Sequence, residues 1–509
     1  MDELERARIR VYLNDPEGRG ERLVDTAPPL HVDEGPWAFR VEGPAPEPKP
    51  FATDTPEFLY WQLASALERG KRLWTRRLPS GRWVPGQVLP AVPVAGEDLN
   101  AYYDRRALRF FRDVDPESGR VVHSGDSVDI ATHEQGHAIL DGVRPDLWDA
   151  PHFEVAAFHE AFGDLASIFV ALAEPPISAA VVGETSGEPE RSNLVSRLAE
   201  ELGAAIRLRY GDDATVPRAL RDAVNTFKYV DPKTLPDSAP ANELSAEPHS
   251  FCNVLTGACW DLLVVLFRRN GLADRAAALS SAADALAFYA AAAAETSPSG
   301  ADFYGRFARR IVREADTASD PAAPELAEAL FRRRLIATPN VPRELDPDED
   351  RGVLAPEDGE PIPPALLAAI TARLPPGPGG EIVKLSMRRG GAAPRSRVLR
   401  GRRRRDLFLR GSEYGPADGA AVEISDSFAL AFSEAGFLRA SRMHAASSRD
   451  AEDARAFVRF LARRRAIADE VEFRVATPRL VREGKSHAVV KEGDGVRRVR
   501  RVWIAGEGA

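Results

Sequence analysis

The chain has 509 residues, of which 44% are hydrophobic and 28% charged, and this length predicts two to four domains with a large buried core. The balance is that of an ordinary soluble protein, and we find no apolar run of 18 residues that would predict a membrane-spanning helix. The net charge of −9 is unevenly spread, because residues 381–509 carry about +11 and the remainder about −20.

The first residues, MDELERARIRVYLND, are charged where a secretory signal would carry a positive cap and then an apolar run. We therefore expect a cytoplasmic protein that makes no membrane contact. The only cysteines, Cys252 and Cys259, would lie two turns apart on a helix, which is too far for a disulfide. We interpret both as small buried apolar residues.

The N-terminal quarter predicts short strands and one long helix. Residues 1–50 form a strand-rich extension with strand-like runs at Ile9–Leu13 and Ala38–Val41, and they end in a stiff proline-rich connector. Helical periodicity begins after Thr55. Residues 92–111 then alternate like a pair of strands around a turn.

The chemistry of the chain begins at an H-E-x-x-H motif formed by His133, Glu134 and His137. On a helix the two histidines project from one face, as two ligands of one zinc must. A carboxylate at Glu134 can accept the proton of a zinc-bound water, which makes it a general base rather than a ligand. Two histidines on an amphipathic helix can also be core or surface residues, so the motif needs a third ligand.

A second apolar-periodic segment, FHEAFGDLASIF, offers that ligand. Glu160 begins it, and Asp164 lies one turn further along the same face. Asp164 can accept the free ring N–H of a ligating histidine and so fix its tautomer. His159 directly precedes Glu160 and, like His152, is interpreted as a structural or surface histidine.

HEQGH followed by HEAFGD, with Glu160 23 residues after His137, resembles the thermolysin-like zinc metallopeptidases. The resemblance implies that His133, His137 and Glu160 hold one zinc ion. It implies that Glu134 is the catalytic base and that Asp164 supports a ligand. It covers roughly residues 50–340 and is most specific at this pair of segments.

The resemblance extends to residues that would hold a substrate. Asn100 and Ala101 match an edge strand that binds the substrate backbone, although the spacing alone also fits an ordinary turn asparagine. Arg221, 28 residues before His249, matches an arginine that binds the substrate carbonyl. Residues near Ile130 and Leu220 would form an apolar pocket for the residue after the cut.

His249 matches the histidine that donates to the oxyanion of the tetrahedral intermediate. Its acidic partner is either Glu243 or Glu247, and the sequence leaves that choice open. The chain departs from the family where a tyrosine would help polarise the scissile carbonyl. Trp148 lies at a comparable distance from His137 and has an N–H donor, but a packing role is the commoner use of tryptophan.

The chain also departs from the family at its calcium sites. Asp129 matches a position that helps to bind calcium in relatives, whereas Ala171 stands where a carboxylate is expected. Glu174, Glu184 and Glu188 remain, but calcium needs several converging oxygens. We therefore expect no calcium.

Beyond residue 340 the composition changes twice. Residues 341–380 read as an acidic, proline-rich linker, and residues 381–509 as a basic α+β domain that we assign to no family. Its run Arg402–Arg405 is interpreted as a solvated loop, or as a face that docks on the acidic protease domain or recruits a protein partner. Without interleaved aromatic residues we do not expect nucleic-acid binding.

The predicted fold is therefore α+β, a thermolysin-like two-lobed zincin followed by a small α+β domain. The predicted lobes are a mixed α/β lobe at 51–158, which holds the H-E-x-x-H helix, and a helical lobe at 159–340.

The predicted function is a zinc-dependent endopeptidase that acts on a peptide or protein substrate. We expect a preference for a hydrophobic residue after the scissile bond, with narrow or gated specificity. The alternatives are a zinc aminopeptidase, for which no amine-binding motif is apparent, and a catalytically degenerate zincin that serves as a binding scaffold.

Overall fold

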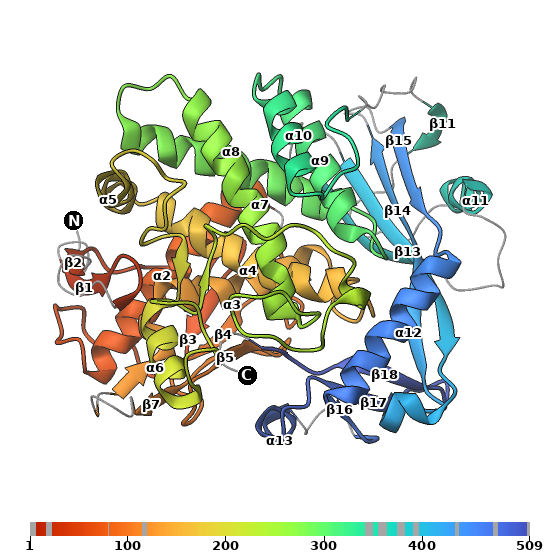
Figure 1. The fold of residues 1–509 in the computed structure, drawn as a ribbon, viewed down its shortest axis with the longest axis horizontal. Coiled ribbons are helices and arrows are strands. Elements are labelled where there is room, and N and C mark those ends of the chain that lie inside the picture. Colours follow the sequence, from red (N-terminus) through yellow and green to blue (C-terminus); the bar gives the residue numbers. More distant parts are fainter. Residues whose placement is uncertain are drawn as a thin grey trace.

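The computed structural model describes residues 7–16, 23–79, 81–114, 119, 121–341, 350–354, 364–373, 382–389, 397–432, 437–471 and 477–505. Over these residues the protein is a mixed α+β structure with one group of long helices and several separate sheets (Figure 1).

Helix α2 (Pro56–Arg77) begins where the sequence predicts it, because the Thr55 side chain accepts a hydrogen bond from the backbone N–H of Phe58 at 3.2 Å. Proline at the first helical position costs nothing, since that N–H has no partner within a helix. The helix buries an apolar face that includes Leu63, Leu67 and Trp74.

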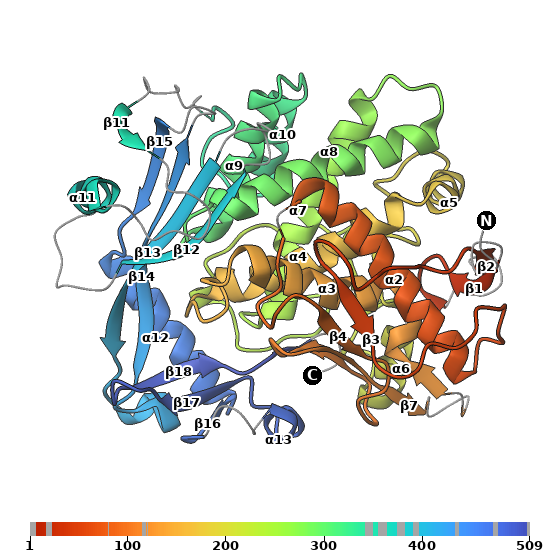
Figure 2. The ribbon, with the colours of Figure 1, turned by 180° about the vertical axis from the view of Figure 1, so that it is seen from behind.

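A five-stranded sheet lies beside α2 and has the strand order β19-β5-β6-β4-β3 (Figure 2). Its strands are β3 (Phe39–Val41), β4 (Leu89–Val92), β5 (Ala101–Tyr103), β6 (Leu108–Phe110) and β19 (Ile504–Ala505). The predicted strand pair within 92–111 is present as antiparallel β5 and β6. The outermost strand, β19, comes from the far end of the chain.

The helices that follow form the centre of the protein. They are α3 (Val128–Val143), α4 (Phe153–Leu172), α5 (Pro175–Thr185), α6 (Glu200–Tyr210), α7 (Pro248–Arg269), α8 (Arg275–Thr296), α9 (Phe303–Thr317) and α10 (Ala323–Arg332). Three two-stranded sheets accompany them: β1 (Ile9–Tyr12) with β2 (Leu23–Thr26), β7 (Arg112–Val114) with β8 (Val121–His123), and β9 (Arg197–Leu198) with β10 (Arg221–Asp222). One continuous hydrophobic core joins these helices to the five-stranded sheet. The predicted lobe boundary at 158/159 lies inside α4.

Contrary to the expectation that no apolar run is long enough to span a membrane, three helices reach that length and hydropathy. They are α4, α7 and α8, and their apolar windows are 100%, 83% and 61% buried within the protein. Their apolarity has a packing reason, since central helices are covered by protein on most of their faces.

The C-terminal part is an eight-stranded sheet with one helix packed on it (Figure 1). Its strands are β11 (Asp350–Leu354), β12 (Ile382–Arg389), β13 (Arg397–Phe408), β14 (Ala421–Phe432), β15 (Phe437–His444), β16 (Ile467–Ala468), β17 (His487–Lys491) and β18 (Arg497–Arg501). Its helices are α11 (Pro364–Arg373), α12 (Ser448–Arg463) and α13 (Thr477–Arg482). The sequence EFRVA at 472–476 also predicts a strand, but these residues lie outside the described residues.

The run Arg402–Arg405 lies inside β13 and not in a loop. Arg402 pairs with Glu423 and Arg403 pairs with Asp426, each at 2.6 Å, and both carboxylates lie on the neighbouring strand β14. The run is therefore largely neutralised by its own sheet.

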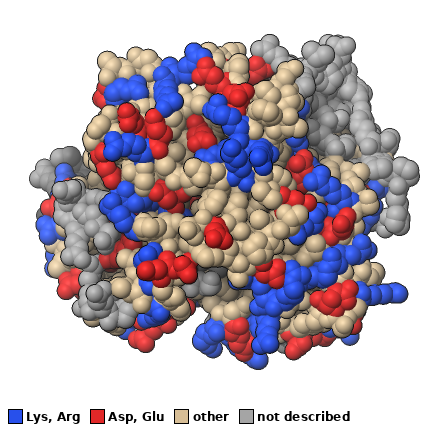
Figure 3. All heavy atoms as spheres, in the orientation of Figure 1, with Lys and Arg blue, Asp and Glu red and all other residues tan. Residues whose placement is uncertain are grey.

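The C-terminal sheet and α12 pack against the helical part through apolar and charged contacts. Phe153 of α4 packs on Phe457 and Phe460 of α12, with ring centroids 5.2 and 5.3 Å apart. Arg463 at the end of α12 pairs with Asp237 at 2.6 Å. In Figure 3 Lys and Arg gather over this corner of the molecule, at the lower right.

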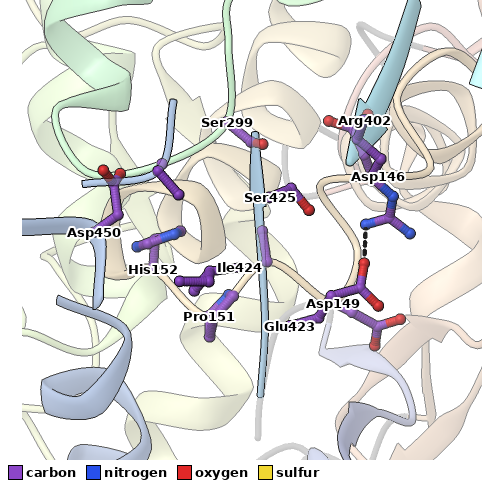
Figure 4. Close-up of a pocket in the computed structure, with 13 residues that line it drawn as sticks. Asp146, Asp149, Pro151, His152, Ser299, Arg402, Glu423, Ile424, Ser425 and Asp450 are labelled. Carbon is purple, nitrogen blue, oxygen red and sulfur yellow. Dashed lines mark ion pairs between the residues drawn. The ribbon is translucent and has the colours of Figure 1, made fainter. Parts of the chain in front are cut away.

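A crevice between the two parts is lined by the loop that follows α3 and by β13 and β14 (Figure 4). The Arg402–Glu423 pair closes one side of it, and His152 and Asp450 line the other. His152 is itself buried, with Nδ1 2.9 Å from Oδ2 of Asp453. It therefore contributes to the contact between the two parts.

Candidate metal centre

The candidate metal ligands lie on α3 and α4, which approach each other closely at two glycines. A Cβ atom at Gly136 would lie 2.9 Å from the Cβ of Ala166, and one at Gly163 would lie 2.7 Å from the His133 ring. Only glycine leaves room for this approach, because real Cβ contacts are essentially never so short. The Ser127 side chain begins α3 by accepting a hydrogen bond from the N–H of Ile130.

The structure brings His133, His137 and Glu160 together at this contact. One ligand atom from each residue lies within 4.8 Å of the others, and all three side chains are buried. Nε2 of His133 is 3.5 Å and Nε2 of His137 is 3.7 Å from Oε2 of Glu160. These separations exceed ordinary hydrogen bonds, whereas two imidazole nitrogens and one carboxylate oxygen around a common point can hold a metal ion.

His137 supports this interpretation through its unmet hydrogen-bonding capacity. Among the described residues, neither of its ring nitrogens has a hydrogen-bond partner, and the same holds for Oε2 of Glu160. Burial, reinforced by the neighbouring His133, lowers the pKa of His137 well below its usual value. The ring is therefore neutral, which is the form that binds a metal. Buried polar atoms without partners are costly, and a cation would satisfy them.

Asp164 lies behind the centre and contacts His133, Arg221, Thr256 and Cys252. Its Oδ1 is 3.2 Å from Nδ1 of His133 and accepts a hydrogen bond from Arg221 at 2.6 Å. Its Oδ2 accepts a hydrogen bond from the Thr256 hydroxyl at 3.1 Å. Although burial alone would raise it, the pKa of Asp164 is held well below its usual range by Arg221 and His133. An ionised Asp164 orients the His133 ring with Nε2 toward Glu160.

Arg221 therefore has a partner that the sequence did not predict. Its side chain is buried and bound to Asp164, and the segment Arg221–Asp222 is fixed as β10 against β9. Its predicted role in holding a substrate carbonyl stays a prediction.

His249 lies in the first turn of α7 and is 22% exposed, with Nε2 3.3 Å from Oε2 of Glu160. Its Nδ1 is 2.8 Å from Oε1 of Glu247, so Glu247 and not Glu243 is its acidic partner. Burial opposes protonation, but the charges of Glu160 and Glu247 outweigh it and raise the pKa of His249 to about 9. At neutral pH the ring is a positively charged donor beside the metal centre.

Glu134 is fully buried on α3, next to His133 in the sequence. The other two predicted substrate residues, Asn100 and Ala101, lie at the start of β5 and are also buried. The Asn100 amide reaches Asp98 at 3.5 Å. Strand β5 is tied to the metal helix, because the Tyr103 hydroxyl donates to Asp141 of α3 at 3.1 Å.

Trp148, considered above as a substitute for the missing tyrosine, is buried with its Nε1 donating to the backbone carbonyl of Arg501 at 3.2 Å. Sequence reasoning misses this partner, because the two residues are 353 positions apart along the chain.

The carboxylates considered for calcium have protein partners. Asp129 accepts a hydrogen bond from the N–H of Ala199 at 3.3 Å. Glu184 accepts from the N–H of Leu194 at 2.8 Å and pairs with Arg197 at 3.1 Å. Each is used to hold a loop in place.

No protein-family model, curated protein or solved structure matches this chain. The chemistry of the centre is therefore argued from its own residues.

Proposed function

We propose that this protein is a zinc-dependent endopeptidase with a thermolysin-like two-lobed arrangement of residues 51–340. The observation that carries the proposal is the convergence of His133, His137 and Glu160, one ligand atom from each within 4.8 Å, in a buried site. Two imidazoles and one carboxylate with an open position are the ligand set of catalytic zinc.

When bound, zinc would act as a Lewis acid that polarises a peptide carbonyl and acidifies water. Glu134, beside His133, would accept a proton from the attacking water and pass it to the leaving amine. His249, held as a cation by Glu160 and Glu247, would donate to the carbonyl oxygen as negative charge develops there. Asp164 would keep His133 in the ligating tautomer.

The substrate part of the proposal rests on the position of β5. Asn100 directly precedes this strand and Ala101 begins it. The strand contacts α3, so an extended peptide added to its edge would run alongside the metal centre. Ile130 and the partly buried Leu220 are the proposed lining of an apolar pocket for the residue after the cut.

The second candidate function is a catalytically inactive zincin that serves as a binding scaffold, and one observation favours it. The edge of β5 is paired with β19, so the described structure presents no open strand edge there. An aminopeptidase has no such support.

The proposal is tested by metal analysis of the purified protein. We expect one zinc per chain, lost in His133→Ala and retained in His31→Ala, which removes an exposed histidine paired only with Glu34. A chain that binds no zinc, or a His133→Ala variant that retains it, would contradict the ligand assignment.

A further inference from the structure

The C-terminal arm, which we define as Arg501–Ala505, leaves the C-terminal sheet and crosses to the five-stranded sheet. Its strand β19 pairs antiparallel with β5, with Ile504 opposite Tyr103 and Ala505 opposite Tyr102. Figure 1 shows the C-terminus beside β5, at the end of the segment that leaves β18. Without the arm, β5 would be the edge strand of its sheet.

The arm is seated by side chains as well as by its backbone. Ile504 is 2% exposed and belongs to the same hydrophobic core as the metal helices. Trp503 is buried against Tyr102 of β5, with ring centroids 5.6 Å apart. The arm therefore fills a site in the helical part of the molecule.

The backbone of Arg501 is held from both sides by the loop that follows α3. Its N–H donates to Oδ1 of Asp149 at 2.9 Å, and its carbonyl accepts from Nε1 of Trp148 at 3.2 Å. A donor and an acceptor that bind one residue's backbone in this way recognise an extended peptide, whatever its side chains.

The Arg501 side chain is 5% exposed. Burial lowers its pKa to about 10, while the charges of Glu160 and Asp149 act in the opposite direction. The arm thus places a buried cation within the electrostatic reach of Glu160.

We propose that the C-terminal arm is an intramolecular inhibitor, which occupies the edge of β5 by strand addition and must leave before an extended peptide can reach the metal centre. The statement that the arm inhibits the protein rests on the proposed function, whereas the statement that the arm occupies a peptide-binding edge does not. The contacts define the competing ligand as an extended segment with a bulky apolar residue at the place of Ile504.

The arm stays bound because it is covalently joined to the rest of the chain. A segment joined to the rest of its chain competes at an effective concentration of roughly millimolar, so a free peptide must bind strongly or the arm must first be displaced. The signal that displaces it would act on the C-terminal sheet, because β18 leads directly into the arm.

Two truncations form a matched pair for the test. A chain that ends at Trp503 loses both residues of β19, whereas a chain that ends at Ala505 is shortened but keeps both pairs with β5. Each carries Glu134→Gln so that bound peptide is not consumed. The probe is a fluorescent peptide of residues 500–509, and binding is measured by anisotropy.

We expect the chain that ends at Trp503 to bind this peptide at least tenfold more tightly than the full chain, and the chain that ends at Ala505 to bind it like the full chain. Equal binding by all three, with unchanged circular dichroism and melting, would overturn the proposal. The shorter chain could bind the peptide and yet fail to cleave it when Glu134 is restored. That result would support the arm as the natural occupant of the β5 edge, but it would contradict the proposed peptidase activity.

A second variant keeps the test valid if the truncated chain fails to fold. Tyr102 and Ala505 are directly opposite, so Tyr102→Cys with Ala505→Cys allows a disulfide that locks the arm. The oxidised protein should bind the peptide more weakly than the reduced protein, which should bind it like the full chain. Equal binding in both states would also overturn the proposal.

Discussion

Two buried charged regions of this protein are built in opposite ways. In β13 and β14, Arg402 and Arg403 each meet a carboxylate at 2.6 Å, so positive and negative charges are matched within the sheet. At the α3–α4 contact, His137 and Glu160 instead present buried atoms that have no hydrogen-bond partner among the described residues. A matched set of charges is complete as it stands, whereas the buried ring nitrogens of His137 in the second set would gain a partner from a metal ion.

The largest expected effect on stability comes from removing a carboxylate from the paired charges of β13 and β14. Asp426 is fully buried and accepts hydrogen bonds from Arg403 at 2.7 Å and from the N–H of Ala446 at 2.9 Å. Asp426→Asn would leave buried arginine without its counter-charge and cost about 3–5 kcal/mol of the free energy of unfolding. Urea denaturation measures this loss, and the zinc content should not change.

Asp494→Asn is the matched control for this substitution, because Asp494 also pairs with an arginine, Arg498, at 2.7 Å but is 51% exposed. An exposed pair of this kind contributes little to stability, because water and salt screen it. If the two variants lost equal stability, the contrast between the buried and exposed pairs would be wrong.

Glu154 offers an intermediate case, a buried carboxylate satisfied by hydrogen bonds from Tyr229 and from the N–H of Tyr304, each at 2.7 Å. Burial raises its pKa from 4.5 to about 7. The folded state therefore retains a proton that the unfolded state loses above pH 4.5, so this stabilisation is present at low pH and disappears as the pH rises through 7.

Between pH 5 and pH 8 the parent protein should lose about 2–3 kcal/mol more stability than Glu154→Gln, whose side chain does not titrate. Urea unfolding of both proteins at the two pH values measures the difference. Parallel pH dependences would show that Glu154 is ionised in the folded state throughout.

The smallest effect on stability is expected from a substitution at the contact between α3 and α4. This substitution should also weaken metal binding. Gly163→Ala would place a Cβ atom 2.7 Å from His133, displace the ring and cost about 1–3 kcal/mol by overpacking. Zinc affinity should fall at least tenfold. Gly183→Ala in α5 is the control, since nothing lies within 4 Å of its added Cβ. Equal zinc affinity in both variants would mean that the close approach does not shape the centre.

The same contrast shows how much the sequence could predict. Features encoded by nearby residues were found: the helical periodicity after Thr55, and the pair β5–β6. Helical spacing also places His133 and His137 on one face of α3, whereas the approach of Glu160 from α4 was implied only by the family resemblance.

Features that depend on distant residues were missed. The pairing of β19 with β5 joins positions about 400 residues apart, and no local pattern specifies it. The long apolar helices α4, α7 and α8 were underestimated, because their few charges obscure how apolar each one is. The choice of Glu247 over Glu243 needed the geometry of the first turn of α7, and strand β15 carried too little alternation to be predicted.

The central claim, that His133, His137 and Glu160 on α3 and α4 form a catalytic zinc centre, is tested most directly at Glu134. Zinc content and casein cleavage would be measured for the full chain and for the chain that ends at Trp503, each with and without Glu134→Gln. We predict one zinc per chain in all four proteins, with cleavage greatest in the shortened chain and lost in both Glu134→Gln forms. A Glu134→Gln protein that cleaves casein as fast as its parent would contradict the account.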